Sequence, residues 1–231
     1  MLFRSARQSR RLPARLLPRT GAASAMSGRG GREHVALVHG YLANKVLLAP
    51  LGWRLRRQGY ATTAWGYWNI RCSLLMHAAR FARELESLDE NPAIDTLHLV
   101  THSMGGIIAR AALDRFRPRK LGRVVMLAPP NKGSFVATRM AGTIGRVLKP
   151  VAELSTASDS LVNALPMPAG IELGVIAAEW DALVSDESTR PDVPHAYAMI
   201  PTFHSGLLFR RDAADLVASF LKRGDFAAGA A

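Results

Sequence analysis

The sequence of 231 residues lacks the features that mark several large classes of protein. It has one cysteine, Cys72, so an internal disulfide is excluded, and a reducing, cytoplasmic setting is expected. It has no glycine-rich phosphate loop with a lysine, and its seven histidines do not follow the spacing of metal ligands. No internal repeat is visible, and no apolar run is long enough for a membrane span or a secretory signal core. We therefore expect no metal, no organic cofactor and no transmembrane segment.

Acidic residues are missing from the first 32 positions. This segment holds eight arginines and supplies two thirds of the formal net charge of +12, whereas residues 33–231 hold 22 basic and 18 acidic residues. We expect residues 1–32 to be a disordered basic arm, a transit-like organellar segment, or the product of a start codon assigned too early, with Met26 as the alternative start. Aromatic residues are not interleaved with these arginines, so nucleic-acid binding is not expected.

Hydrophobic residues make up 48% of the chain, in short apolar runs that alternate with helical patterns. Strands are expected at 34–38, 60–65, 95–101, 121–127, 172–177 and 197–200. Helices are expected near 44–58, 73–88, 104–115, 136–149 and 212–222. Near-continuous apolar strands separated by helices predict the α/β class, with one domain over 33–231, a mostly parallel sheet of about six strands, and helices on both faces. Functional groups are then expected at the carboxyl ends of the strands.

Ser103 lies between an apolar run and a helical pattern, within Thr101-His102-Ser103-Met104-Gly105-Gly106. This context is typical of a nucleophile elbow, a tight turn that lifts the serine hydroxyl above the sheet. Thr101 departs from the glycine that begins the usual G-x-S-x-G pattern, and an ordinary helix N-cap also places a serine at such a position. The helix that follows would direct its N-terminal amides at a developing oxyanion.

His39-Gly40 ends the first expected strand. A glycine there lets the backbone turn so that the next amide faces the nucleophile. The amides of Tyr41 and Met104 are therefore predicted to form an oxyanion hole, although a plain glycine turn at a strand end has the same pattern.

An acid and a histidine follow the last two expected strands. Asp181 is predicted to orient a histidine by accepting its Nδ1–H, with Asp186 as a competitor and Glu179 as a weaker one. His204 is predicted as the general base, whereas His195 precedes its strand and should lie at the opposite edge. The chain order Ser, Asp, His agrees with a hydrolase triad.

Taken together, these segments resemble the α/β-hydrolase superfamily, and within it the small lipase and esterase-like members. The stretch Ala128 to Ser134 is similar to a strand-end segment of bacterial triacylglycerol lipases and of hydrolases like the GPI-inositol deacylases. The resemblance spans roughly 33–222. It implies that Ser103 is the nucleophile, His204 the general base and Asp181 the orienting acid.

Residues from about 135 to 170 form an insertion between the fourth and fifth expected strands. Met140, Ile144, Val147 and Leu148 recur in it at helical spacing, which fits either a small lid over Ser103 or an ordinary helix packed on the core. The aromatic segment 65–69 is expected near the same rim.

The sequence therefore predicts a serine hydrolase of a small-molecule or lipid carboxylic ester, acting through an acyl-enzyme. An acyltransferase, amidase or thioesterase would use the same triad, and a binding module on this fold is the alternative without catalysis. The natural substrate, the acyl-chain length and the oligomeric state stay open.

Overall fold

Six parallel strands form the central sheet of the structure, a computed structural model that describes residues 31–226 apart from 42, 68–71, 142–152 and 159. The strands are β1 (Glu33–Val38), β2 (Ala61–Trp65), β3 (Thr96–His102), β4 (Leu121–Leu127), β5 (Leu173–Ala178) and β6 (Ala196–Ile200). Their order across the sheet is β2-β1-β3-β4-β5-β6, and each neighbouring pair is parallel. The predicted parallel sheet of about six strands is confirmed.

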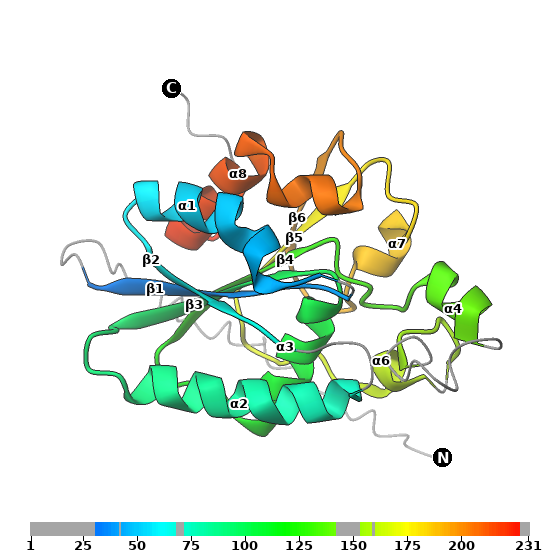
Figure 1. The fold of residues 1–231 in the computed structure, drawn as a ribbon, viewed down its shortest axis with the longest axis horizontal. Helices are drawn as coiled ribbons and strands as arrows, with labels where there is room; N and C mark the ends of the chain where they lie inside the picture. Colours follow the sequence, from blue (N-terminus) through cyan, green and yellow to red (C-terminus); the bar gives the residue numbers. More distant parts are fainter. Residues whose placement is uncertain (1–30, 42, 68–71, 142–152, 159, 227–231) are drawn as a thin grey trace, which may run out of the picture. The chain divides into compact units, whose positions relative to one another are not determined.

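Helices cover both faces of this sheet (Figure 1). The helices are η1 (Lys45–Leu48, a 3-10 helix), α1 (Ala49–Arg57), α2 (Leu74–Glu90), α3 (Met104–Arg115), α4 (Phe135–Ala141), α6 (Leu161–Ala164), α7 (Asp186–Thr189), η2 (His204–Leu208, a 3-10 helix) and α8 (Arg211–Arg223). The pair α1 and α8 lies on one face, and the pair α2 and α3 lies on the other (Figure 1). None of the helices among the described residues has the length and apolar character that a bilayer crossing requires.

Each strand of the sheet centre is buried on both sides. In β1, Val35 and Leu37 belong to the core under α1 and α8, while Ala36 and Val38 belong to the core under α2 and α3. This alternation follows from the period of two in a strand, and it explains why the run reads as continuously apolar in the sequence. Each fully buried Val or Leu contributes roughly 1.5–3 kcal/mol of transfer free energy, so burial of this sheet on both faces is a main source of the stability of the fold.

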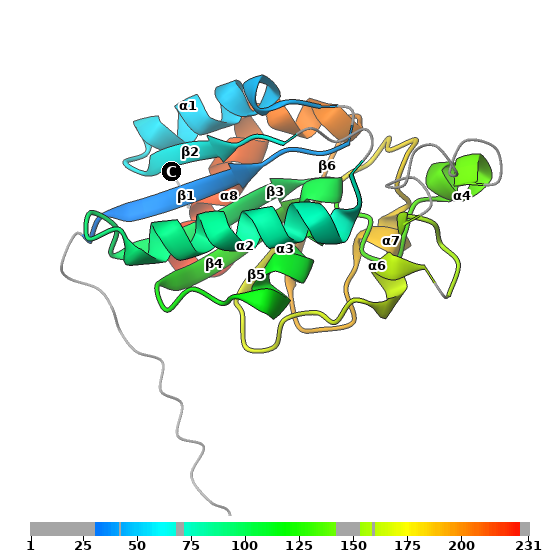
Figure 2. The ribbon, with the colours of Figure 1, turned by 60° about the horizontal axis from the view of Figure 1, so that its bottom comes forward.

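The loops at the carboxyl ends of the strands carry α4, α6 and α7, which gather at one end of the sheet (Figure 2). Helices α4 and α6 belong to the predicted insertion 135–170. The predicted helix 136–149 is described only as far as Ala141, so Ile144, Val147 and Leu148 lie outside the described residues. The lid therefore stays a prediction. So does the basic arm, of which only residues 31 and 32 are described.

Candidate active site

Ser103 forms the junction between β3 and α3 with φ 53° and ψ −128°. A non-glycine residue in such a conformation costs about 1–3 kcal/mol, and it persists only where the surroundings fix it. The Ser103 N–H donates to the carbonyl of Leu127 at the end of β4, over 2.8 Å. A Cβ added at Gly105 would stand 2.7 Å from the carbonyl oxygens of Val38 and His39, so α3 begins in direct contact with the backbone of β1. Strand and helix therefore hold the strained serine from both sides.

Gly40 brings the end of β1 against Ser103. A Cβ at Gly40 would lie 2.8 Å from the Ser103 Cβ, so only glycine allows this approach. The Met104 amide, at the first position of α3, has no acceptor within the helix, whereas the Gly106 amide donates to the Ser103 carbonyl over 2.9 Å. The segment Gly40–Tyr41 and the N-terminus of α3 thus border one small region beside the Ser103 side chain.

His39 and Tyr67 together fix the Gly40–Tyr41 peptide. The Tyr67 N–H donates to His39 Nε2 over 3.3 Å, so the ring proton is on Nδ1, which donates to the Gly40 carbonyl over 2.9 Å. The two rings stack with centroids 4.2 Å apart, and the Tyr67 hydroxyl donates to the His39 carbonyl over 2.8 Å. Burial lowers the pKa of His39, and this effect outweighs the hydrogen bond to Gly40, which acts to raise it. The lowered pKa keeps the ring neutral. Because C=O and N–H point in opposite directions across a trans peptide, the Tyr41 N–H points away from the His39 ring.

Asp181 and His204 form a hydrogen-bonded pair between the β5 and β6 loops. The His204 Nδ1 donates to Asp181 Oδ2 over 2.6 Å, and both side chains are more than nine-tenths buried. The amides of Leu183 and Val184 donate to Asp181 Oδ1 over 2.8 and 3.0 Å. Burial acts to raise the pKa of the Asp181 carboxyl, but the bond and charge of His204 and these two amides outweigh it, so the pKa is lowered. Asp181 is therefore an ionised acceptor that orients His204.

The buried side chain of His102 contacts His204. Its Nε2 donates to the His204 carbonyl over 3.2 Å, and the two rings lie 4.8 Å apart. Burial and the nearby charge of His204 lower the pKa of His102 to about 3, so this ring is neutral at pH 7. The sequence does not reveal the contact of His102 with His204, because nothing in the spacing relates the two positions.

The alternative candidates for the acid and the base lie away from the pair of Asp181 and His204. Asp186 begins α7 and binds Tyr197 and Arg190, and Glu179 is exposed. His195 precedes β6 and bonds to the carbonyl of Val193 over 2.7 Å, at the end of the strand away from Ser103. His204 is the first residue of η2. Cys72 is free and half-buried, just before the N-cap of α2.

The segment Ala128–Ser134 holds the acid loop in place. Ser134 Oγ donates to the carbonyl of Leu183 over 2.6 Å, and the Lys132 N–H donates to the carbonyl of Ser188 over 3.0 Å. The Asn131 side chain donates to the carbonyl of Thr189 over 2.8 Å. In the sequence, this segment is distinguished only by its resemblance to a strand-end segment of lipases. Its contacts with residues 183–189 give it a physical role, because Leu183 stands two positions after Asp181.

The described residues show no hydrogen bond between the Ser103 hydroxyl and His204, a contact that in ligand-free hydrolases is often long. Among the residues that the structure describes, no group of three or more His, Cys, Asp or Glu side chains is placed to hold a metal ion.

All the predicted site residues lie at the carboxyl ends of β1, β3, β5 and β6, namely Tyr41, Ser103, Met104, Asp181 and His204. Tyr67, at the end of β2, joins them as a residue whose contact with His39 the sequence did not reveal.

Comparison with known proteins relates the chain to others through its structure alone, since no family model and no curated protein matches the sequence. Lipase BlEst2 of Bacillus licheniformis in its mature form superposes with a TM-score of 0.66 at 16% identity, covering 85% of this chain and 93% of the lipase. Lipase B of Aspergillus fumigatus gives 0.68 at 13% identity, covering 87% and 55% of the two chains. A carboxylesterase structure from Nitrososphaera gargenis gives 0.57 at 15% identity, covering 84% and 91%. The chain has the α/β-hydrolase fold.

Proposed function

We propose that this protein is a serine hydrolase of carboxylic esters. The main support is the strained backbone of Ser103 at the start of α3. This serine lies at the same end of the sheet as the hydrogen-bonded pair of His204 and Asp181. A serine hydroxyl needs such a base to become a nucleophile, and the base needs an acid to fix its tautomer. The folds of the lipases and the carboxylesterase named above support an ester as the substrate.

The reaction follows from the roles of these three groups. Ser103 Oγ attacks the acyl carbonyl while His204 Nε2 accepts its proton. The imidazolium is stabilised by Asp181, whose lowered pKa keeps it ionised. His204 then returns the proton to the leaving alcohol, and water, activated by the same histidine, releases the acid from the acyl-enzyme.

The oxyanion of the tetrahedral intermediate is bound by the amides of Tyr41 and Met104. The Met104 amide begins α3, where the helix dipole favours negative charge. His39 acts as a positioning residue, because its Nδ1–H holds the Gly40 carbonyl and thereby the plane of the peptide that carries the Tyr41 N–H. Tyr67 keeps the His39 ring in the required tautomer.

Turnover of a matched set of p-nitrophenyl esters, amides and thioesters by the full chain and by Ser103→Ala tests this function. We expect the highest kcat/KM on esters, and a loss of about a thousandfold or more in a folded Ser103→Ala variant. A preference for thioesters or amides would reassign the leaving group. Transfer of the acyl group to added alcohols in preference to water would indicate an acyltransferase. If the chain turned over no acyl compound, the remaining interpretation would be a binding module without catalysis.

A further inference from the structure

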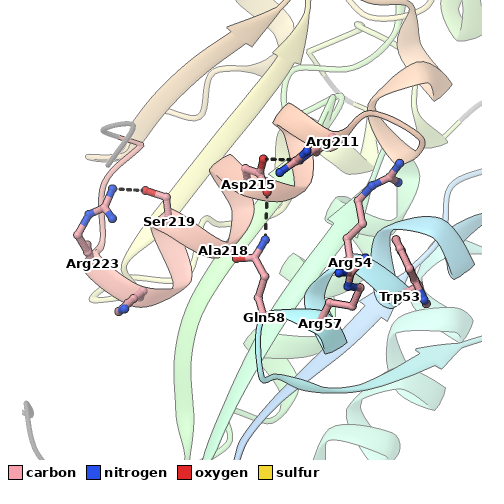
Figure 3. A pocket seen from close by; sticks show the side chains of 10 residues that line it. Trp53, Arg54, Arg57, Gln58, Arg211, Asp215, Ala218, Ser219 and Arg223 are labelled. Atoms are coloured by element: carbon pink, nitrogen blue, oxygen red, sulfur yellow. Dashed lines mark hydrogen bonds and ion pairs between the residues drawn. The ribbon is translucent and has the colours of Figure 1, made fainter. Parts of the chain in front are cut away.

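A surface groove of about 740 Å³ runs between α1 and α8, on the face of the sheet opposite α2 and α3. Its side chains come from these two helices and from Gln58, which directly follows α1 (Figure 3). Its charged lining consists of Arg54, Arg57, Arg211, Lys222, Arg223 and Asp215. None of these residues belongs to the ester site, which lies in the loops at the carboxyl ends of the strands.

The single carboxylate of the groove is already engaged. Asp215 forms an ion pair with Arg211 at 3.6 Å and accepts a hydrogen bond from the Gln58 side chain over 3.1 Å (Figure 3). Among the residues that the structure describes, Arg54, Arg57 and Lys222 form no ion pair with a carboxylate. The groove therefore holds three cations whose charge the described part of the protein leaves without a partner.

Arg57 and Arg54 each have a distinct environment in the groove. The Arg57 guanidinium lies over the Trp53 ring, 5.0 Å from its centroid, and the Trp53 side chain is half-exposed. A guanidinium over the face of an aromatic ring is attracted to it, and its N–H donors stay available for an anion. Arg54 is partly buried, and its Nη1 is buried with no acceptor among the described residues, which is an unfavourable position for a cationic donor unless an anion lies near it.

The concentration of charge also distinguishes this surface. Residues 33–231 carry 22 basic and 18 acidic side chains, an excess of four, and the lining of this one groove has the same excess. Like charges gathered on one face destabilise the folded chain, and a bound anion removes that cost. Arginine forks match the oxygen pairs of phosphate groups, and a groove of this volume has room for more than one such group.

We propose that the groove between α1 and α8 binds a ligand through its phosphate groups. Two sources share this chemistry, namely a soluble molecule with several phosphates and the head groups of anionic phospholipids. The exposed Trp53 within the groove and the half-exposed Phe209, two positions before α8, are compatible with contact to a lipid surface.

The test compares two double variants of the full chain. Arg57→Gln with Lys222→Gln removes two exposed cations of the groove. Arg83→Gln with Arg115→Gln removes two exposed cations from α2 and α3 on the other face of the sheet and serves as the control. The arginines of residues 1–32 are present in every protein, so a difference between the variants reports the groove alone. Melting temperature and turnover of a short ester check that both variants are folded.

Two probes distinguish the sources, inorganic tripolyphosphate by calorimetry and phosphatidylglycerol vesicles by co-sedimentation, with phosphatidylcholine vesicles as the neutral reference. We expect at least one anionic probe to bind the unmodified chain and the control alike, and the groove variant at least about tenfold more weakly. Binding of tripolyphosphate alone assigns a soluble ligand, whereas groove-dependent binding of the anionic vesicles assigns a lipid head group. Equal binding by the groove variant and the control, or binding of neither probe by the unmodified chain, overturns the proposal.

Discussion

Asp181 accepts three hydrogen bonds, two from the amides of Leu183 and Val184 and one from His204. The two amides use one carboxylate oxygen, and His204 uses the other. The orientation of the histidine is therefore determined by the backbone of the acid loop, which Ser134 ties to the segment after β4. Asp186 has no comparable position, because it binds Tyr197 and Arg190 near the protein surface.

At this scale we predict that Asp181→Asn lowers kcat for ester hydrolysis by about a thousandfold or more, because the amide no longer selects the Nδ1–H tautomer of His204. Asp186→Asn is the matched control, since it makes the same change five positions along the same loop. We expect it to alter kcat by less than about threefold, as for an exposed ion pair. Steady-state kinetics on one p-nitrophenyl ester decides between them. A larger loss for Asp186→Asn would show that the acid has been assigned wrongly.

The choice between these two acids shows how far single residues could be predicted. Distance from the strand end favoured Asp181, but the amides that bind it depend on how the loop folds, which spacing does not reveal. The contact between His39 and Tyr67 was even less predictable from the sequence. Both residues follow strands, yet their stacking requires β1 and β2 to be neighbours, and that adjacency comes only from the structure.

At the scale of elements, the site depends on the close packing of α3 against β1. Gly105 contacts the β1 backbone, whereas the adjacent Gly106 contacts side chains, with the nearest atom, Pro129 Cβ, 3.2 Å from an added Cβ. Backbone atoms of a central strand cannot move aside, but a side chain adjusts by a few tenths of an ångström. The two glycines therefore make a matched pair on one helix.

We predict that Gly105→Ala lowers the free energy of unfolding by about 1–3 kcal/mol or more, the usual cost of overpacking. Gly106→Ala should change it by less than about 1 kcal/mol, because improved helix propensity offsets the tighter contact. Urea unfolding at pH 7 measures both. Equal effects of the two substitutions would show that α3 is not fixed against β1 as described.

The elements themselves were largely predictable. All six strands lie within one residue of their expected limits, because each is an apolar run between helical patterns. The strand order was not predictable, since it depends on the direction in which each crossover returns. The helix expected at 44–58 begins as the 3-10 helix η1, and α6 and α7 have four residues each, too few to give a helical period.

At the scale of the whole molecule, buried histidines couple the stability of the fold to pH. His77 is fully buried in α2, and neither ring nitrogen has a hydrogen-bond partner among the described residues. Burial, with smaller effects of Arg80 and His39, lowers the pKa of His77 to about 4. Between pH 6.5 and pH 4 the unfolded chain therefore binds a proton that the folded chain does not, and stability falls as the pH is lowered.

We predict that His77→Phe makes the protein less sensitive to acid. The unmodified chain should lose about 3 kcal/mol through this residue between pH 6.5 and pH 4, and the variant should not. His102, whose pKa is lowered to about 3, stays in both proteins and contributes a common slope. Melting temperatures recorded across this pH range give the comparison. Parallel curves for the two proteins would exclude His77 as a source of the acid sensitivity.

Covalent labelling with a fluorophosphonate tests the assignment of Ser103 as the nucleophile, because the reagent reacts preferentially with a serine activated by a neighbouring base. Mass spectrometry of the digested full chain should find one adduct, on the peptide that contains Ser103. Labelling should disappear in Ser103→Ala and slow by at least about a hundredfold in His204→Gln, which removes the base. An unlabelled chain, or an adduct that persists in Ser103→Ala, would contradict the assignment of Ser103 as the nucleophile.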